Sequence, residues 1–293
     1  MGPQKLQEGT VVIDVTLHRP GDSRRINLKA DTAANETWLK HSKRIFKSDL
    51  YNRCCRVQDG VKTWLKARSL PVGLHGCYAV PLAILPDALD MIDQAQAELT
   101  EAVEAFAAER ERIEAEANEQ LKDLFRRGQV PTAAYIRWKF AIETRMVELG
   151  VPGEGKLTAA LSARAREEAK RYWEAAAQDV SRCLWEQFQE LVARLADKLE
   201  PNPDGSRKQL HEGAVTKLVE WLELFGKRNV LGDDQLAELV KRSRLLLNGR
   251  DAEVLRDNAR LREKVGAEFQ RVASAAAEQI GKMPKRRITF DEE

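Results

Sequence analysis

The stretch from Asp87 to Arg127 contains neither proline nor glycine, and it constrains the fold more than any other segment. Large apolar residues recur here at intervals of seven, and alanines follow the first three of them after three residues. This pattern is typical of a closely packed coiled-coil seam. At about 1.5 Å per residue, the helix would be roughly 60 Å long. The large residues are Leu85, Ile92, Leu99, Phe106 and Ile113, and the alanines are Ala88, Ala95 and Ala102.

After Ile113 the stripe shifts to Ala117 and Leu121, which indicates a break in the phase of the repeat. A second long helix is expected over 157–199, with Leu184 and Leu191 among its apolar residues. The simplest packing lays this helix antiparallel on the first, so that each buries the stripe of the other. We therefore expect a mainly α-helical protein built on long antiparallel coiled-coil helices.

The N-terminal region contains the only convincing β pattern. Residues 11–17 alternate apolar and polar side chains, a turn-like sequence follows at 19–23, and the alternation resumes through Ile26 and Leu28. This order predicts a β-hairpin with one buried face. Two short helices are expected at about 35–47 and 48–69. The sequence "LPVGLHGCYAVPLAILP" (70–86) then reads as a packed apolar connector that leads into the long helix.

The remaining segments are also predicted to be helical. One helix is expected over 132–150, where Tyr135, Trp138, Ile142 and Met146 have helical spacing. Residues 200–208 form the best linker candidate, and helices are expected at about 209–226, 233–248 and 250–281. We divide the chain into residues 1–86, the long helices of 87–199, and a C-terminal helical bundle with a basic tail at 200–293.

The charge balance excludes some classes of protein. The chain of 293 residues has 48 lysines and arginines against 46 aspartates and glutamates, unlike a histone-like polycation. We expect no membrane span and no secretory signal, because no apolar run is long enough. The four cysteines do not suggest a disulfide framework in a chain of this size, so a cytoplasmic location is expected.

The most suggestive chemical motif is "GVPGEGKLT", in which Gly150, Gly155 and Lys156 have the spacing of a phosphate-binding P-loop. The position that requires Ser or Thr is Leu157, and Thr158 comes one residue late. The segment is also expected to follow a helix ending at Leu149, whereas a P-loop follows a buried strand. We therefore interpret it as a loop between two helices.

A second candidate joins His75 and Cys77 with Cys54 and Cys55, as a zinc site or a Cys/His nucleophile pair. Zinc ligands usually come in C-x₂₋₄-C pairs, and adjacent cysteines on a helix point in different directions. Cys54 fits a buried stripe instead. The acidic residues of the long helix alternate with arginines, as on a solvated face. We expect no catalytic group, no metal or other cofactor and no small-molecule substrate.

Basic clusters are the stronger candidates for binding, because phosphates attract clustered cations and bases stack on aromatic rings. Arg137, Trp138, Lys139 and Phe140 interleave charge and aromatic rings, although Trp138 has the spacing of a core residue. Two further clusters are candidates for nucleic-acid binding: Lys241, Arg242 and Arg244, and Lys285, Arg286 and Arg287.

The order of features up to the long helix resembles a bacterial and phage family of helical proteins known only as a domain of unknown function. The resemblance covers roughly residues 9 to 125 and includes the step "YAVP", Tyr78 to Pro81, before the long helix. It implies a helical component of a larger machine encoded on phages, plasmids or other mobile elements. Genes for a MoxR-type AAA+ ATPase and a von Willebrand-type protein often lie near those of the family. The resemblance implies no catalytic residues.

Two functions from different classes follow. The first is a non-enzymatic scaffold or adaptor that self-associates through its long helices and works with an AAA+ ATPase. Its seam would be formed by Ile92, Leu99, Phe106, Ile113, Leu184 and Leu191. The alternative is a nucleic-acid-binding protein of phage or plasmid metabolism that uses the basic clusters. Salt separates the two, because phosphate contacts weaken steeply with salt and apolar helix contacts do not.

Overall fold

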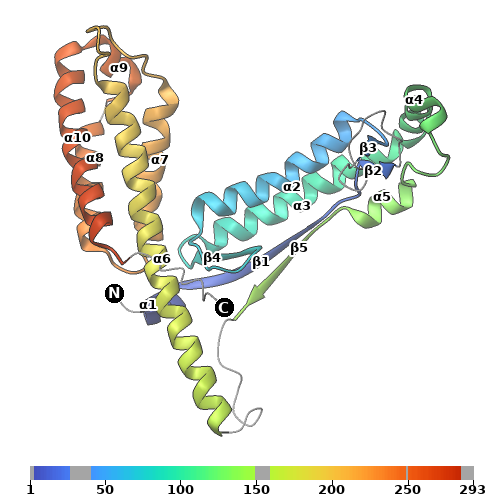
Figure 1. Cartoon of the computed structure of the whole chain (residues 1–293), viewed down its shortest axis with the longest axis horizontal. Helices are drawn as coiled ribbons and strands as arrows, with labels where there is room; N and C mark the ends of the chain where they lie inside the picture. The colour runs from blue at the N-terminus through green and yellow to red at the C-terminus, as the bar shows by residue number, and fades with distance from the viewer. Residues whose placement is uncertain (1–2, 27–40, 149–158, 249, 285–293) are drawn as a thin grey trace, which may run out of the picture.

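The protein is mainly helical and contains a small β-sheet (Figure 1). A computed structural model describes residues 3–26, 41–148, 159–248 and 250–284. The first half contains α1 (Pro3–Gly9), β1 (Thr10–His18), β2 (Ser23–Ile26), β3 (His41–Arg44), α2 (Asp49–Arg68), β4 (Cys77–Pro81), α3 (Leu85–Ala108), α4 (Arg110–Leu121), η2 (Lys122–Leu124), α5 (Ala133–Lys139) and β5 (Ala141–Val147). The second half contains α6 (Ala159–Leu199), α7 (Glu212–Arg228), α8 (Asp234–Leu247), α9 (Ala252–Asp257) and α10 (Ala259–Lys282). None of these helices is both long and apolar enough to cross a membrane.

The sheet corrects the prediction of an N-terminal hairpin. Strand β1 is the middle of three antiparallel strands in the order β4-β1-β5, with Ile13 opposite Tyr78 on one side and Met146 on the other. Residues 23–26 form β2, which pairs with β3 and not with β1. The alternation in 11–17 therefore identifies the strand correctly, but its partners come from segments far along the chain.

Helices α2, α3, α4 and α5 share one hydrophobic core, and we call this group, with the strand pair β2–β3 at its end, the α3 arm. In this arm α2 and α3 lie along one face of the sheet (Figure 1). Ser48 caps α2, because its side chain accepts a hydrogen bond from the Tyr51 amide. The predicted long helix does not run straight to Arg127, since it is broken at Glu109 between α3 and α4. Beyond this point Ile113 and Ala117 are the buried residues of α4, and the bend keeps them on the core.

The other group forms the α6 arm, which consists of α1 and the bundle α6 to α10 (Figure 1). Helix α10 runs antiparallel to α6, because its start lies at Leu199 and its end lies at Arg182. The expected antiparallel pairing of the two long helices with each other is not confirmed. Helix α3 packs on α2, and α6 packs on α10. The break between 86 and 87 falls inside the α3 arm, and α6 belongs with the C-terminal helices.

Helices α7 and α8 confirm the predicted segments at 209–226 and 233–248 within a few residues. The helix expected at 250–281 is divided at Asn258, whose side chain accepts a hydrogen bond from the Leu261 amide and caps α10. The prediction of a helix over 132–150 is also wrong in its second half, where the chain forms β5. Residues 41–44 are a strand where a helix was expected, and 27–40 lie outside the described residues.

Several helices end on arginines that come from other elements. The last carbonyls of a helix have no hydrogen-bond donor within the helix and carry partial negative charge. An arginine there donates hydrogen bonds to these carbonyls and also balances their charge. Arg262 donates to the carbonyls of Lys198 and Leu199 at the end of α6 and of Lys208 in the segment after it, at 2.6 to 3.2 Å. Arg228 donates to the Ser69 carbonyl at 3.4 Å, at the end of α2, and thereby links the two arms.

The two buried arginines are expected to contribute differently to the free energy of unfolding. Arg262 is 5% exposed and Arg228 is 1% exposed, and neither has a carboxylate partner among the described ion pairs. Arg228 makes one long hydrogen bond and its Nε has none, and burial lowers the pKa of its guanidinium. We expect Arg262→Met to lower the free energy of unfolding by about 3 kcal/mol, because three carbonyls lose their donor.

The matched variant Arg228→Met should change the free energy of unfolding by less than about 1 kcal/mol, because it also removes a poorly compensated buried charge. Urea unfolding followed by circular dichroism at 222 nm measures both variants. Equal losses for the two variants would contradict this ranking of the arginines.

Candidate interaction surface

The residues of the predicted helix seam lie inside the chain. Ile92, Leu99, Phe106 and Ile113 are buried in the α3 arm, with exposed fractions of 1 to 4%. Leu184 is buried in the α6 arm, and Leu191 packs partly buried against the same core. The structure therefore does not bring the two halves of the predicted seam together.

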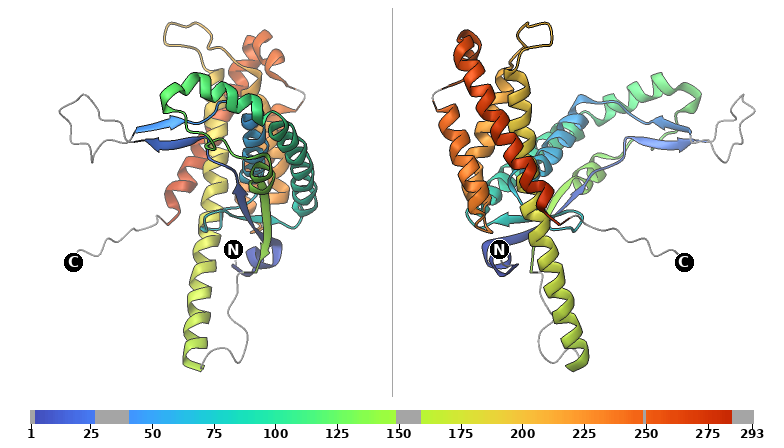
Figure 2. Two further views of the ribbon diagram at one scale, coloured as in Figure 1. Left: turned by 90° about the vertical axis from the view of Figure 1, so that its right-hand side faces the viewer. Right: turned by 60° about the vertical axis from the view of Figure 1, so that its left-hand side comes forward.

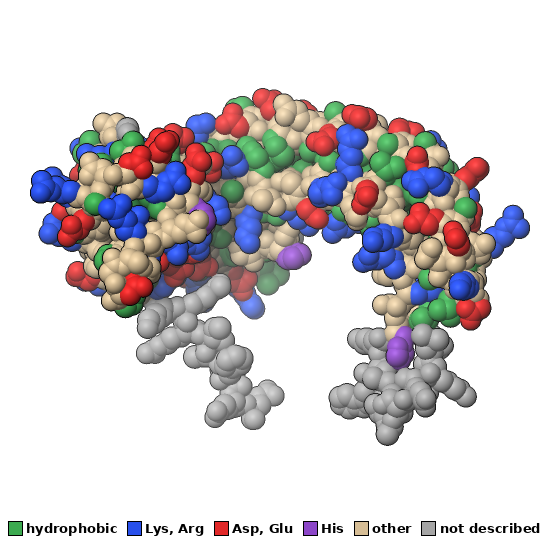
Figure 3. All heavy atoms as spheres, turned by 90° about the horizontal axis from the view of Figure 1, so that it is seen from above, with side chains coloured by type: hydrophobic (Ala, Val, Ile, Leu, Met, Phe, Trp, Pro, Cys, Tyr) green, Lys and Arg blue, Asp and Glu red, His purple; other side chains and the backbone are tan. Residues whose placement is uncertain are grey.

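The basic cluster of α8 is largely engaged within the chain. Arg242 forms an ion pair with Glu268 of α10, and its hydrogen bond lowers the pKa of that carboxyl. Arg244 donates to the Leu222 carbonyl, while Lys241 is exposed. The second cluster, Lys285, Arg286 and Arg287, lies outside the described residues. On the face seen from above, positive and negative side chains are interspersed over both arms (Figure 3).

The P-loop-like residues Gly150, Gly155, Lys156 and Leu157 also lie outside the described residues. The prediction of a helix directly before this motif is wrong, because β5 precedes it, and α6 follows it. However, β5 is an antiparallel edge strand, and Ile142 is its buried residue. In a P-loop the strand is buried. Leu157 still stands where the motif requires a hydroxyl.

The cysteines and His75 are distributed over separate environments. Cys54 is fully buried in the α3 arm, which confirms its interpretation as a core residue, and burial raises the pKa of its thiol to about 11. Burial also raises the pKa of Cys77, which packs against the core of the α6 arm. His75 is exposed. Among the described residues, no group of His, Cys, Asp and Glu has the arrangement of a metal site. The stretch 70–86, expected to be a packed connector, is packed only in part: Leu70, Val72 and the end of β4 are buried, whereas Leu74 and Leu82 are exposed.

The feature that stands out is an exposed pair of aromatic rings on α5. Trp138 is 71% exposed and Tyr135 is 43% exposed, and their ring centroids lie 5.6 Å apart. The Lys139 ammonium lies 5.6 Å from the centroid of the Trp138 ring. Helix α5 ends at Lys139, and the residues buried here are Ile136 and Phe140. The expectation that Trp138 occupies the core is therefore wrong.

The inner side of α5 is fixed by aromatic packing. Phe140 lies 6.3 Å from Phe106 and 5.9 Å from Tyr51, measured between ring centroids. On the outside, Arg137 donates both to Oε1 and to Oε2 of Glu104 on α3, at 2.9 and 3.0 Å, and this lowers the pKa of Glu104. The exposed rings of α5 are therefore presented from a well-anchored helix.

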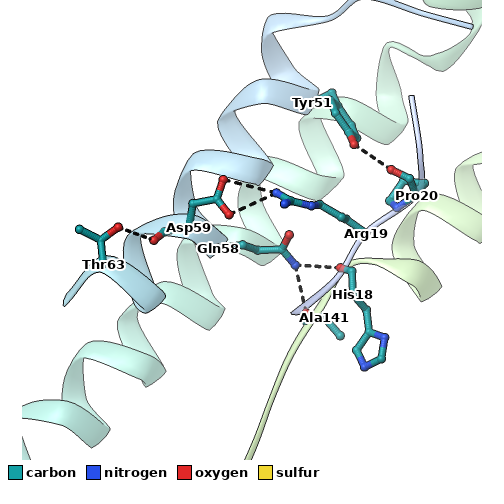
Figure 4. A network of polar contacts seen from close by, with 8 residues as sticks. All are labelled: His18, Arg19, Pro20, Tyr51, Gln58, Asp59, Thr63 and Ala141. Atoms are coloured by element: carbon teal, nitrogen blue, oxygen red, sulfur yellow. Dashed lines mark hydrogen bonds and ion pairs between the residues drawn. The ribbon is translucent and has the colours of Figure 1, made fainter. Parts of the chain in front are cut away.

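A polar network holds the start of β5, just after α5 (Figure 4). The fully buried Gln58 of α2 donates to the carbonyls of His18 and Ala141 at 2.8 and 3.0 Å. Beside it, Arg19 pairs with Asp59 at 3.3 Å, and the Tyr51 hydroxyl donates to the Pro20 carbonyl at 2.8 Å. Burial raises the pKa of the Tyr51 phenol. These contacts are structural, since each fixes β5, the end of β1 or the two residues after β1 to α2.

Comparison with known proteins gives no indication of function, so the function is inferred from the geometry of the chain. No family model, no curated protein and no solved structure matches the chain. The sequence cluster of Arg137 to Phe140 includes the exposed Trp138. The helical spacing of Trp138 nevertheless predicted that this residue is buried in the core. Tyr135 was missed as a surface residue for the same reason.

Replacement of Gln58 by leucine tests the network. Gln58→Leu keeps the volume of the side chain but removes the donor that the His18 and Ala141 carbonyls share. We expect the free energy of unfolding to fall by about 2 kcal/mol. Thr63→Val is the control, because Thr63 donates to the Asp59 carbonyl within one exposed helix turn and should cost less than about 1 kcal/mol. Similar urea midpoints for Gln58→Leu and the unsubstituted protein would contradict the role of Gln58.

The raised pKa of Cys54 predicts slow alkylation. Thiolates and not thiols react with iodoacetamide, and a buried thiol with a pKa of about 11 is almost entirely protonated at pH 7.5. We expect Cys54 to be labelled in unfolded protein but not in native protein within an hour, as measured by peptide mapping. Rapid labelling of Cys54 in the native state would mean that α2 opens readily.

Proposed function

We propose that this chain is a non-enzymatic helical scaffold or adaptor that self-associates through the first part of α6. The observation that carries the proposal is the projection of this helix beyond the rest of the fold (Figures 1 and 2). None of the residues 161–172 is buried, whereas Trp173 and Ala176 are 5% and 6% exposed. Isolated helices of this length are marginal in water, so a projecting helix gains from being covered.

One face of this projecting segment suits a second copy of the chain. Ala169, Ala165 and Leu161 lie within about a quarter of the helix circumference from the buried Ala176, since each residue advances by about 100°. They continue the stripe that is buried further along α6. Small side chains allow a second helix to approach closely. The exposed pairs Arg164–Glu168 and Arg171–Glu167 keep charges of both signs beside the stripe.

The non-enzymatic part of the proposal is supported by the carboxylates. A general acid at neutral pH needs a raised pKa. The described carboxyl groups with a shifted pKa include Glu104 and Glu268, and hydrogen bonds from Arg137 and Arg242 shift both of them downward. They remain ionised in ion pairs and do not resemble acid–base catalysts.

The larger setting of the proposal comes from the family that residues 9–125 resemble. We propose that the protein acts in the cytoplasm within an assembly encoded by a phage or another mobile element, together with an AAA+ ATPase. The seam residues Ile92, Leu99, Phe106, Ile113, Leu184 and Leu191 have a structural role in this proposal, and the surface for association is the stripe on α6.

Light-scattering mass after size exclusion tests the self-association. We expect a defined multimer at micromolar concentration whose mass is the same at low and high salt, because apolar contacts are not weakened by salt. Ala165→Asp combined with Ala169→Asp should yield a monomer with unchanged helical content.

Ala163→Asp is the control for one added charge, because Ala163 is exposed on the opposite side of the same helix. This variant should keep the mass of the unsubstituted protein. An unsubstituted protein that is monomeric throughout, or a double variant that remains multimeric, would refute association through this stripe.

A further inference from the structure

We propose that the exposed side of α5 binds single-stranded nucleic acid, with bases stacked on Trp138 and Tyr135 and phosphates held by neighbouring cations. This inference does not depend on self-association, because it concerns a different surface. The two rings are presented together, with 5.6 Å between their centroids and an interplanar angle of 50°. Exposed aromatic rings bind unpaired bases because every base has a π-face.

The platform is rigid before any ligand binds. Ile136 and Phe140 are 0% and 7% exposed and fix the inner side of α5. Arg137 is held by Glu104, and Thr132 caps the helix by accepting a hydrogen bond from the Tyr135 amide. A ligand that stacks on Trp138 therefore loses little of its binding energy to ordering of the protein.

The charges around α5 favour a polyanion. Residues 124–142 contain Arg126, Arg127, Arg137 and Lys139 and no aspartate or glutamate. Arg126 and Arg127 are exposed in the loop that leads into α5, and Lys139 lies over the face of Trp138. The Glu104 carboxylate beside α5 is already paired with Arg137.

Further cations are brought to the same end of the α3 arm by the strand pair β2–β3 (Figure 1). Lys43 of β3 is buried and donates to the Leu124 carbonyl of η2, which ties this strand pair to the start of the loop. Arg24 and Arg25 are exposed on β2. Carboxylates also lie at this end: Glu114 of α4 is paired with Arg110, whereas Glu111, Glu116 and Glu119 of α4 and Asp123 of η2 are exposed.

A protein partner is the main competing occupant, because tryptophan, tyrosine and arginine are also enriched in protein interfaces. The core of such an interface is depleted of charge. Here cations lie on both sides of the rings, in the loop before α5 and at its end. This arrangement favours bases on the rings and phosphates at the flanks. Unpaired bases are required, because the bases of a duplex are already stacked on each other.

Fluorescence anisotropy with a fluorescein-labelled 20-nucleotide oligodeoxythymidylate tests the proposal on the full-length protein. We expect binding at 50 mM salt, and at least roughly tenfold weaker binding of a duplex of the same length. Trp138→Ala should weaken the binding of the oligonucleotide about fivefold or more, and Trp138→Phe should retain most of it. Because Trp138 is exposed, neither variant should change the thermal unfolding midpoint by more than a few degrees.

A pair of matched double variants locates the phosphate contacts. Arg126→Ala with Arg127→Ala should weaken binding and reduce the slope of log Kd against log salt by about 1.4, which corresponds to two phosphate contacts on a single strand. Lys241→Ala with Arg242→Ala removes the same number of cations from α8 and should leave affinity and slope unchanged.

Three results would overturn the proposal. They are the absence of oligonucleotide binding at 50 mM salt, equal affinities of Trp138→Ala and the unsubstituted protein, and a loss of binding only in the α8 variant. The first would assign the exposed rings to a protein partner, and the third would assign nucleic-acid binding to the cluster of Lys241, Arg242 and Arg244.

Discussion

Strand β1 serves both arms at once, and the arrangement of the whole chain depends on this constraint. Successive side chains of a strand point to opposite faces, so Ile13 and Val15 enter the core of the α3 arm while Val12 enters that of the α6 arm. A slip by one residue would exchange these side chains between the two cores. The register with β4 and β5 is therefore fixed by burial on both sides.

The junction of the arms is completed by polar contacts from side chains, two of which end on backbone carbonyls. The Tyr172 hydroxyl of α6 donates to the Val72 carbonyl in the segment before β4, and Arg228 reaches the Ser69 carbonyl. Lys227 pairs with Asp87, which lies in the first turn of α3. Backbone carbonyls at helix ends need donors in any packing, and the protein supplies them across the junction. The same contacts therefore satisfy the backbone and set the relation between the arms.

The helical elements were largely predictable, because their apolar periodicity is long and uninterrupted. The breaks were harder to locate, since Glu109 and Asn258 interrupt their helices without a proline or a glycine. Strand β5 was missed for a physical reason. Ile142 and Met146 are four residues apart, and this spacing lies on one face both in a helix and in a strand. Partners were not predictable either, because the heptad pattern of α3 shows that a stripe is buried but not which helix covers it.

The error at β5 also concealed the exposed surface of α5. If the helix had continued to Leu149, Trp138 would have faced the same side as Ile142 and would have been buried with it. Because the chain changes to a strand after Phe140, the side that contains Trp138 faces solvent while Ile136 and Phe140 face the core. A change from helical to strand periodicity within one apolar segment thus explains why Trp138 was predicted in the core but lies on the surface.

The two proposed surfaces are of opposite physical kinds, and this makes them compatible in one assembly. The stripe on α6 continues a buried apolar face, and its association should not respond to salt. Helix α5, which carries the exposed aromatic rings, lies at the far end of the α3 arm (Figure 1), and binding of a polyanion there should weaken with salt. A multimer formed through α6 would present several α5 surfaces together. A single strand long enough to reach two of them would then bind more tightly than to one, because the second contact forms at high effective concentration.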